Sequence, residues 1–507
     1  MKYFCMFLAF ALYYLSFASD TNAEFRSIWV CTWDTLSAGS TIDQNKARIR
    51  GILDNIKKAN MNAVLWQARQ DGTVYFPSSY EPWGSYAGSV DPGFDPLEYA
   101  VEEAHKRGLE IHVWVNTFES RKKVKGNPAY EHPEWICRDS GNQSMPAKYS
   151  LSPGLSEVRE YLIRVLMEIV DKYDVDGIQL DYVRWSEYTA SNISKYPDTL
   201  EGPVPEDIIQ DLIETGAGSY LYDAKHPYSQ GVPEGYKSWD DWRRAGVNEF
   251  VKGMHDAIQS SGKPWVKLSA SVLGKYNWSG WNGYYSVLQD GALWYNKGYV
   301  DMLMGMHYHW TTAAGFESML ATGSPECWRD YIQEGLAANH IFTVGPGSYI
   351  LDENNVWWRH PEIVEACRKF DFVHGFEFFS YSSWVKRDYW ATAAAGFFNT
   401  PARVPSGKPA EERLDPPFVD VFRARTMEKK IIRVFPPSTL DPGKKYRFAV
   451  YRSIRGNCDP AIDEIVSLHF GGMEPFLTVD SFMGDAEYYA TTLDRYWNES
   501  DISNLVR

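Results

Sequence analysis

The sequence contains few cysteines, and they follow no recognisable pattern. Cys5 lies in the apolar N-terminal stretch, and the other cysteines are scattered at positions 31, 137, 327, 367 and 458. This odd number cannot all pair with one another, and the spacings do not match those of metal ligands. The sequence therefore argues against a disulfide-stapled scaffold, and we expect mostly buried free thiols.

Positive charge is scarce relative to negative charge. The chain has 51 Lys and Arg residues against 66 Asp and Glu residues, which gives a formal net charge of -15. A surplus of negative charge disfavours nucleic acid and anionic membrane surfaces as the main partner. We therefore expect no nucleic-acid partner, and a neutral or cationic substrate.

Long apolar runs are absent beyond the N-terminus. The run there extends from Phe4 to Phe17, follows Lys2, and leads into small and polar residues that end at Ala23. It is shorter than the ~20 apolar residues that cross a bilayer, and it has the length of the core of a signal peptide. We predict a signal peptide over residues 1–23, a secreted or periplasmic location and no membrane insertion.

Aromatic side chains, in contrast, are abundant. They make up 15% of the residues, with 20 Trp and 33 Tyr. Carbohydrate-binding clefts use such rings as stacking surfaces, although large cores also use them. The length of 507 residues suits a barrel of about 250–400 residues with one accessory module.

Eight short runs of β-branched and aromatic residues recur along the chain, each followed by a longer amphipathic stretch. After the first run, Ile42, Ile49, Leu53 and Ile56 recur at helical spacing. Eight repeated strand and helix units predict a closed parallel (β/α)8 TIM barrel of the α/β class. The predicted strands span residues 26–34, 62–69, 109–116, 177–183, 266–274, 301–308, 341–349 and 374–381.

Two segments depart from a minimal barrel. Residues 186–238 are rich in Pro, Gly, Tyr and acidic residues, and such an insertion either shapes the substrate groove or is a solvated excursion. Beyond Asn399, a Pro-rich stretch leads into alternating β patterns. We predict a barrel over residues 24–399, a linker over residues 400–416 and a small β-sandwich over residues 417–507.

Several segments resemble a known family. VEEAHKRGLEIHVWVN, DGIQLDYVRW and GYVDMLMGMHYHW occur in the order found in the glycosyl hydrolase-like 10 family. The resemblance covers nearly the whole predicted barrel and implies a secreted or periplasmic glycoside hydrolase, with some relatives acting on peptidoglycan glycan strands. YYATTLDRYWNES resembles the fibronectin type III-like module that often follows this barrel. Gly305 and Met306 stand where the family often has Pro and Gln, and this departure leaves the exact substrate open.

Asp181 is the leading candidate for a catalytic group. It lies at the end of the fourth predicted strand and is followed by Tyr182, Arg184 and Trp185. A carboxylate at the C-terminal end of a barrel strand points into the mouth, where it can act as nucleophile or as general acid or base. The neighbouring rings and guanidinium would stack on and hydrogen-bond a sugar. The alternative is a structural acid paired with Arg184.

Strand parity adds substrate-binding candidates. Side chains two residues apart share a face, so Gln67 and Arg69 point inward together, and Asn116 and Asp181 belong to the inward sets of their own strands. Polar groups at these positions are costly to bury unless they are paired or bind a ligand. Arg69, Asn116 and Asp181 should therefore face one pocket, with Arg69 either free to bind sugar or paired with Asp181.

Four further residues complete the substrate-binding set. Trp33 near the end of the first predicted strand is a stacking platform or a core residue, and Tyr381 ends the eighth strand. His307 and His309 share a face of the sixth predicted strand, where, with Tyr308 and Trp310, they would donate to sugar hydroxyls or form half of a metal site. A third metal ligand is not evident, so we expect no metal and no cofactor.

Hydrolysis by the usual route needs a second carboxyl group, for which Glu377 is the first candidate. It lies in the apolar stretch HGFEFFSYSSW, where Phe376 and Phe378 would raise its pKa as a general acid requires. The alternative is a Glu that lies beneath the site or on the outer face of the barrel. Asp34 and Glu119 are rival candidates.

The sequence thus predicts a glycoside hydrolase that cleaves a polysaccharide or cell-wall glycan. By analogy with other barrels, Asp181 is the nucleophile of a retaining reaction. A non-catalytic glycan-binding barrel would present the same aromatic rings without a second acid across from Asp181. A structural cell-surface protein would have a shallow cleft poor in polar groups. The sugar, the linkage and the oligomeric state stay open.

Overall fold

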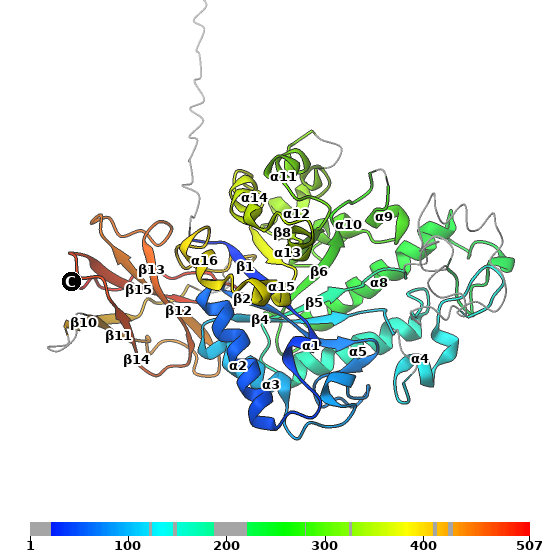
Figure 1. Ribbon diagram of the computed structural model, residues 1–507, viewed down its shortest axis with the longest axis horizontal. Coiled ribbons are helices and arrows are strands. Elements are labelled where there is room, and N and C mark those ends of the chain that lie inside the picture. The colour runs from blue at the N-terminus through cyan, green and yellow to red at the C-terminus, as the bar shows by residue number, and fades with distance from the viewer. Residues whose placement is uncertain are drawn as a thin grey trace, which may run out of the picture.

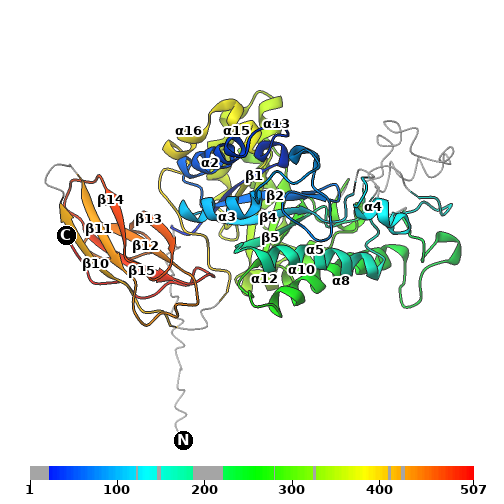
Figure 2. The ribbon, with the colours of Figure 1, turned by 90° about the horizontal axis from the view of Figure 1, so that it is seen from below.

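The computed structural model describes residues 22–120, 124–144, 150–186, 221–278, 280–323, 327–408, 413–423 and 429–507. Within these ranges a barrel is followed by a smaller all-β module that lies beside one end of the barrel (Figures 1 and 2). Nearly all of the predicted signal peptide and most of the predicted insertion at residues 186–238 lie outside the described residues.

Eight parallel strands close the barrel in the part of the chain that the structure describes, which confirms the predicted fold class. Each strand pairs with the next, and β1 pairs with both β2 and β9, so the sheet has no open edge. A two-residue strand, β3 (Thr73–Val74), adds to β2 in antiparallel fashion. The barrel strands are β1 (Phe25–Val30), β2 (Ala63–Gln70), β4 (Glu110–Asn116), β5 (Gly177–Asp181), β6 (Lys267–Leu273), β7 (Met302–His307), β8 (Ile341–Pro346) and β9 (Gly375–Phe378).

Helices surround the strands, and several of them begin at residues whose side chains cap the helix. The hydroxyl of Thr41 accepts a hydrogen bond from the backbone N–H of Gln44, and Asp95 and Ser238 cap their helices in the same way. None of the helices in the described ranges is long and apolar enough to cross a membrane. The longer helices are α2 (Ile42–Lys58), α3 (Pro96–Lys106), α5 (Ser156–Lys172), α8 (Trp239–Gln259), α11 (Ala313–Leu320) and α14 (His360–Cys367).

Short helices lie in the connections between the longer elements. They are α1 (Thr32–Thr35), α4 (Pro128–Glu131), α9 (Gly283–Ser286), α10 (Gly291–Asn296), α12 (Gln333–Ala337), α13 (Ser348–Glu353), α15 (Tyr381–Arg387) and α16 (Trp390–Ala395). Three of them correct the predicted strand ends, because α1, α13 and α15 begin within three residues of the ends of β1, β8 and β9. The predicted strands 26–34, 341–349 and 374–381 were therefore too long. Asp34 lies in α1, where its carboxylate accepts from the N–H of Cys31.

Two layers of apolar side chains hold the barrel together. The larger layer lies between strands and helices and includes Ile28, Val64 and Ile178. The inner layer fills the barrel with residues such as Trp29 and Met304. The inner cluster continues into the C-terminal module, so one apolar core spans both parts of the chain.

The C-terminal module is a small β-sandwich, as predicted. Its cores include Val419, Ile432 and Tyr488. The resemblance to a fibronectin type III-like module stays a prediction. One antiparallel sheet contains β10 (Phe418–Arg423), β11 (Lys430–Phe435) and β14 (Phe476–Asp480), and the other contains β13 (Glu464–Gly471), β12 (Tyr446–Ser453) and β15 (Glu487–Leu493).

The first part of the predicted linker packs on the barrel. The carbonyl of Thr400 accepts a hydrogen bond of 2.5 Å from Arg26, and the carbonyl of Ala402 accepts one of 2.9 Å from Asn62. Val404 joins the inner apolar cluster. The chain thus leaves the barrel along its surface, which favours a fixed position for the module that follows.

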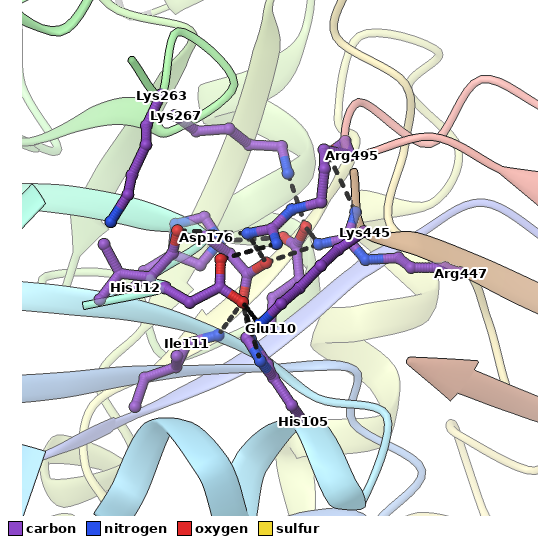
Figure 3. Close-up of polar contacts among 12 residues, drawn as sticks. His105, Glu110, Ile111, His112, Asp176, Lys263, Lys267, Lys445, Arg447 and Arg495 are labelled. Atoms are coloured by element: carbon purple, nitrogen blue, oxygen red, sulfur yellow. Dashed lines mark hydrogen bonds and ion pairs between the residues drawn. The ribbon is translucent and has the colours of Figure 1, made fainter. Parts of the chain in front are cut away.

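A buried network of charges joins the module to the N-terminal end of the barrel (Figure 3). Arg447 of β12 donates to Glu110 at 2.8 Å and to Asp176 at 2.6 Å, and Lys267 pairs with Glu110 at 2.6 Å. Arg495 also pairs with Asp176, at 3.0 Å. Charges at this depth are tolerated only when they are paired, so the barrel and the module depend on one another. Glu110, Asp176 and Lys267 all stand where strands begin, at the end of the barrel that serves stability.

Candidate active site

A cleft opens at the C-terminal ends of the barrel strands. Its volume of ≈ 410 Å³ falls in the range of small-molecule sites. The position is the face at which TIM-barrel enzymes carry their active sites. The polar side chains of the lining belong to Gln67, Gln70, Asn116, Asp181, Arg184, Lys275 and His309. The aromatic side chains of the lining belong to Trp33, Trp114, Tyr182, Trp281, Tyr308, Tyr349 and Phe379.

Asp181 is the last residue of β5 and is only 7% exposed. Its Oδ2 accepts a hydrogen bond of 3.2 Å from the indole Nε1–H of Trp114, and its Oδ1 accepts one of 2.7 Å from the backbone N–H of Tyr182. Hydrogen bonds that donate to a carboxylate stabilise its charged form and fix its orientation. The carboxylate is therefore held in place at the floor of the cleft.

The backbone turns sharply just after Asp181. Tyr182 has φ +48°, a left-handed conformation that side chains other than glycine seldom adopt. Such strain persists only where surrounding contacts maintain it, and it concentrates at functional sites. The Arg184 guanidinium lies 4.7 Å from the centre of the Tyr182 ring and 5.9 Å from that of Trp281. The turn thus brings a cation and two rings beside the carboxylate.

Two amide side chains extend the floor of the cleft. Gln67 donates a hydrogen bond of 3.1 Å to Oδ1 of Asn116, and its own oxygen accepts from the backbone N–H of Thr32 at 3.1 Å. Asn116 donates to Glu119 at 3.3 Å. Each amide is oriented by its neighbours, which is the arrangement needed to recognise ligand hydroxyls.

The rim of the cleft carries the side chains of Lys275, His309 and Trp33. Burial and the nearby Lys275 charge both lower the pKa of His309, so its ring is neutral at pH 7. Trp33 is 42% exposed, and its Nε1–H donates to Ser382 at 3.3 Å. An exposed indole held by a hydrogen bond presents a flat surface on which a sugar ring can stack.

Arg69 does not face the cleft, contrary to the prediction. It is fully buried and forms two hydrogen bonds to Glu81, of 2.8 and 2.6 Å. The predicted Arg69–Asp181 pair is therefore wrong, and Arg69 is not among the residues that line the cleft. Glu81 lies in the connection between β2 and α3, where no periodic pattern points to it as a partner.

Three more predicted substrate-binding residues lie in the core. The Nε1–H of Trp185 donates to the carbonyl of Arg243 at 3.0 Å, and the hydroxyl of Tyr381 accepts from Asn55 at 2.9 Å. His307 is fully buried on the helix side of β7, with its ring centre 6.2 Å from that of Phe342. The structure thus brings Trp33, Gln67, Asn116, Tyr182, Arg184 and His309 to the cleft around Asp181, but not Arg69, Trp185, His307 or Tyr381.

Glu377 faces the barrel interior, one layer beneath the cleft. Phe379, two residues later on the same face, lines the cleft, whereas Glu377 is 1% exposed. Gly345 makes room for it, since a Cβ there would approach Oε1 of Glu377 to 2.9 Å. Burial raises the pKa of Glu377 well above its usual range, which is the predicted direction and the one that a general acid requires.

The rival acids also lie outside the lining. Asp34 accepts a hydrogen bond of 2.7 Å from Ser382, and Glu119 contacts Asn116 from behind the cleft. Among the described residues that line the cleft, Asp181 is the single carboxylate. Nowhere in the described ranges do three His, Cys, Asp or Glu side chains gather as metal ligands would.

Several residues of the lining were not predicted from the sequence. Tyr349 follows the end of β8, so its position in the barrel was a usable signal, whereas Tyr308 after β7 was predicted together with the two histidines as a donor to sugar hydroxyls. Burial raises the pKa of Tyr308, and the charge of Asp181 raises it further, so its hydroxyl stays protonated. Lys275 and Trp281 come from the loop after β6, where no sequence pattern marks them.

The closed barrel, with a fixed carboxylate among aromatic rings at its C-terminal face, defines a glycoside hydrolase-type TIM barrel. Residues 24–326 match the model of the family "Glycosyl hydrolase-like 10". The chain therefore belongs to the glycosyl hydrolase-like 10 family.

Two bacterial glycosyl hydrolases agree with this assignment by their sequences. The chain is 26% identical to the glycosyl hydrolase YngK of Bacillus subtilis, over 71% of this chain and 69% of YngK. It is 27% identical to the glycosyl hydrolase DigH of Escherichia coli, over 56% of this chain and 62% of DigH. Among solved structures, the PgaB (BpsB) glycoside hydrolase domain from Bordetella bronchiseptica aligns with 73% of this chain and 98% of its own length, with 12% identity and a TM-score of 0.45.

Proposed function

We propose that this chain is a secreted or periplasmic glycoside hydrolase that cleaves glycosidic bonds in a polysaccharide or cell-wall glycan. The observation that carries the proposal is Asp181, held by the N–H groups of Trp114 and Tyr182 at the floor of a cleft lined by aromatic rings. Rings that stack on sugars and a fixed carboxylate are two of the elements that glycoside hydrolysis requires of a site.

In the proposed reaction, the Asp181 carboxylate attacks the anomeric carbon or stabilises the positive charge that develops there. Because its two donors hold it in one orientation, little reorganisation is needed as the bond breaks. In a retaining reaction Asp181 forms a covalent bond to the sugar, and water then hydrolyses that bond. Gln67 and Asn116 would position the sugar through hydroxyl groups.

The leaving oxygen must receive a proton from an acid. Glu377 has a raised pKa, as a general acid requires, but it lies beneath the lining of the cleft. Tyr308 lines the cleft, but burial and the charge of Asp181 raise its pKa, which makes its hydroxyl a weak acid. We therefore keep Glu377 as the proposed acid, toward which the lining would have to open when a glycan binds.

A non-catalytic glycan-binding barrel is the second candidate function. The observation that favours it is that Asp181 is the single carboxylate among the described residues of the lining. Both usual hydrolytic geometries place a second carboxyl within about 10 Å of the first, across the cleft. Binding without hydrolysis would use the same rings and amides.

The deciding experiment measures reducing-end release by the mature protein and its Asp181→Asn variant on a polysaccharide panel that includes peptide-free peptidoglycan strands. We expect release by the parent, and a fall of about 10²-fold or more in the folded variant. Asp43→Asn, which removes an exposed acid from the first turn of α2, is the matched control and should keep full activity. Glycan binding by the parent and the variant without release by either would establish the binding function instead.

A further inference from the structure

A second cavity lies where the barrel meets the β module. Its volume is ≈ 340 Å³, and its lining includes Asp174 and Trp265 of the barrel and Tyr446, Arg495 and Tyr496 of the module. We call it the junction cavity. A concave site of this size is large enough to bury one or two sugar rings.

The junction cavity is rich in aromatic rings. Trp265 is half-buried, and the Arg495 guanidinium lies 5.8 Å from the centre of its ring. Tyr446 is largely buried, and its hydroxyl accepts a hydrogen bond of 3.3 Å from the backbone N–H of Asp441. Tyr496 is half-buried and contributes a third ring. Such rings have apolar faces and polar edges, which suits a ligand with C–H faces and hydroxyl edges.

The charged groups of the junction cavity nearly cancel. Asp174 pairs with Arg495 at 2.9 Å and also with Lys445. Lys444 and Asp494 add one charge of each sign, so the lining holds three cationic and two anionic side chains, and Asp176 beside the lining also pairs with Arg495. A cavity with compensated charge offers hydrogen-bond donors and acceptors without a strong field. This balance favours a neutral sugar over a phosphate or a nucleotide, which would need an excess of positive charge.

Buried ion pairs keep the two walls of the junction cavity together. Arg495 reaches from the module to Asp174 and Asp176 of the barrel, and Arg447 lies behind it on Asp176 and Glu110 (Figure 3). A site held by such a network exists before the ligand arrives. Binding there does not have to order the two parts of the chain first.

The junction cavity and the active-site cleft lie at opposite ends of the barrel. Asp174 and Trp265 precede β5 and β6, whereas Asp181 and Leu273 of the cleft stand at the ends of these strands. Two segments of glycan can therefore occupy both sites without competing. Occupation of one site would raise the local concentration of the polymer at the other.

We infer that the junction cavity is a second carbohydrate-binding site, built jointly by the barrel and the β module, for a sugar unit of a neutral glycan. This site goes beyond the proposed hydrolase function because no bond is cleaved there. The experiment that tests this site measures binding and not hydrolysis, so the site can be confirmed even if the protein cleaves no glycan.

The test uses the mature full-length protein in affinity gel electrophoresis, through gels that contain soluble starch, galactomannan, mixed-linkage β-glucan or hydroxyethyl cellulose, with alginate as a charged comparison. We expect at least one neutral polysaccharide to retard the parent. Trp265→Ala should weaken that retardation at least 5-fold, and Trp265→Tyr, which keeps a ring, should restore most of it. Tyr496→Ala gives a second and independent removal of a ring.

Trp33→Ala, which removes a ring of the cleft, is the control for binding at the other site. Circular dichroism and thermal unfolding establish that each variant is folded. The proposal is overturned if no neutral polysaccharide retards the parent, or if retardation is lost in Trp33→Ala but unchanged in Trp265→Ala and Tyr496→Ala. Retardation by alginate alone would also overturn it, since that result requires an anionic ligand.

Discussion

The indole Nε1–H of Trp114 on β4 donates a hydrogen bond of 3.2 Å to Oδ2 of Asp181 on the neighbouring strand β5. The two side chains project from adjacent inward positions, and both line the cleft. Trp114 also packs edge-on against Trp29 of the inner core, with ring centres 4.9 Å apart. The orientation of the proposed catalytic carboxylate is thus tied to the packing of the barrel interior.

Replacing Trp114 by Phe removes the N–H donor but keeps an aromatic ring at this position, so it should impair the reaction mainly through the lost hydrogen bond. Because a hydrogen bond to a charged group contributes about 1.5–3 kcal/mol, we expect Trp114→Phe to lower kcat/KM about 10-fold or more. The check is steady-state kinetics on the best substrate of the panel. Trp281→Phe, which replaces a cleft ring without a contact to Asp181, is the comparison. Equal losses in both variants would assign Trp114 a stacking role only.

Glu377 should make the protein less stable as pH rises. Its pKa is raised by burial, so the folded state keeps a proton that the unfolded chain releases above about pH 4.3. The stabilising contribution is therefore complete at low pH and is lost as pH increases. We expect Glu377→Gln to gain free energy of unfolding relative to the parent between pH 4 and pH 8.

Denaturant unfolding at several pH values measures this difference. Glu160→Gln on the exposed side of α5 is the matched control and should show no such trend. A constant difference between Glu377→Gln and the parent across the pH range would contradict a protonated Glu377. If Glu377 is the general acid, the same variant also loses kcat.

The buried charges at the N-terminal end of the barrel should make the protein less stable as pH falls, which is opposite to the effect of Glu377. Burial alone would raise the pKa of Glu110, but the charges of Lys267 and Arg447 lower it below its usual range. Burial would likewise raise the pKa of Asp176, but the charges of His105 and Arg495 lower it well below its usual range. A lowered pKa contributes stability above the usual carboxyl range that is lost as pH falls. We expect the melting temperature to drop steeply below about pH 4, and differential scanning calorimetry over a pH series measures it.

Arg447 should be essential for joining the two parts of the chain. Arg447→Ala leaves Glu110 and Asp176 with fewer buried partners, and breaking a buried pair costs about 3–5 kcal/mol. Arg433→Ala, which breaks the solvent-exposed pair of Arg433 with Asp420, should change the free energy of unfolding far less, because exposed ion pairs contribute little. Chemical unfolding of the full-length variants compares the two losses, and similar values would show that the buried network contributes little.

Most of the fold could be predicted from the sequence, because strands and helices follow local patterns. All eight predicted barrel strands overlap observed strands, and the helix between the first two was found from the spacing of Ile49, Leu53 and Ile56. The errors fell at the C-terminal ends of strands. There the chain enters short helices such as α1 and α15, and apolar residues continue across the boundary.

The alternation of side chains along the strands correctly predicted part of the candidate site but misplaced His307. Gln67, Asn116 and Asp181 face the cleft because side chains alternate as long as the strand continues. His307 points outward, since the inward positions of β7 are those of Met302 and Met304. His309 reaches the cleft from beyond the strand, where the period of two no longer applies.

The sequence by itself determined the succession of strands and helices and the placement of a carboxylate at the end of β5, because both depend on neighbours along the chain. Only the tertiary structure decided which charges pair. Arg69 binds Glu81 instead of Asp181, and Arg447 reaches Glu110 across 337 positions of sequence. Partners of this kind meet through the closure of the barrel and the docking of the module, and such contacts leave no local pattern in the chain.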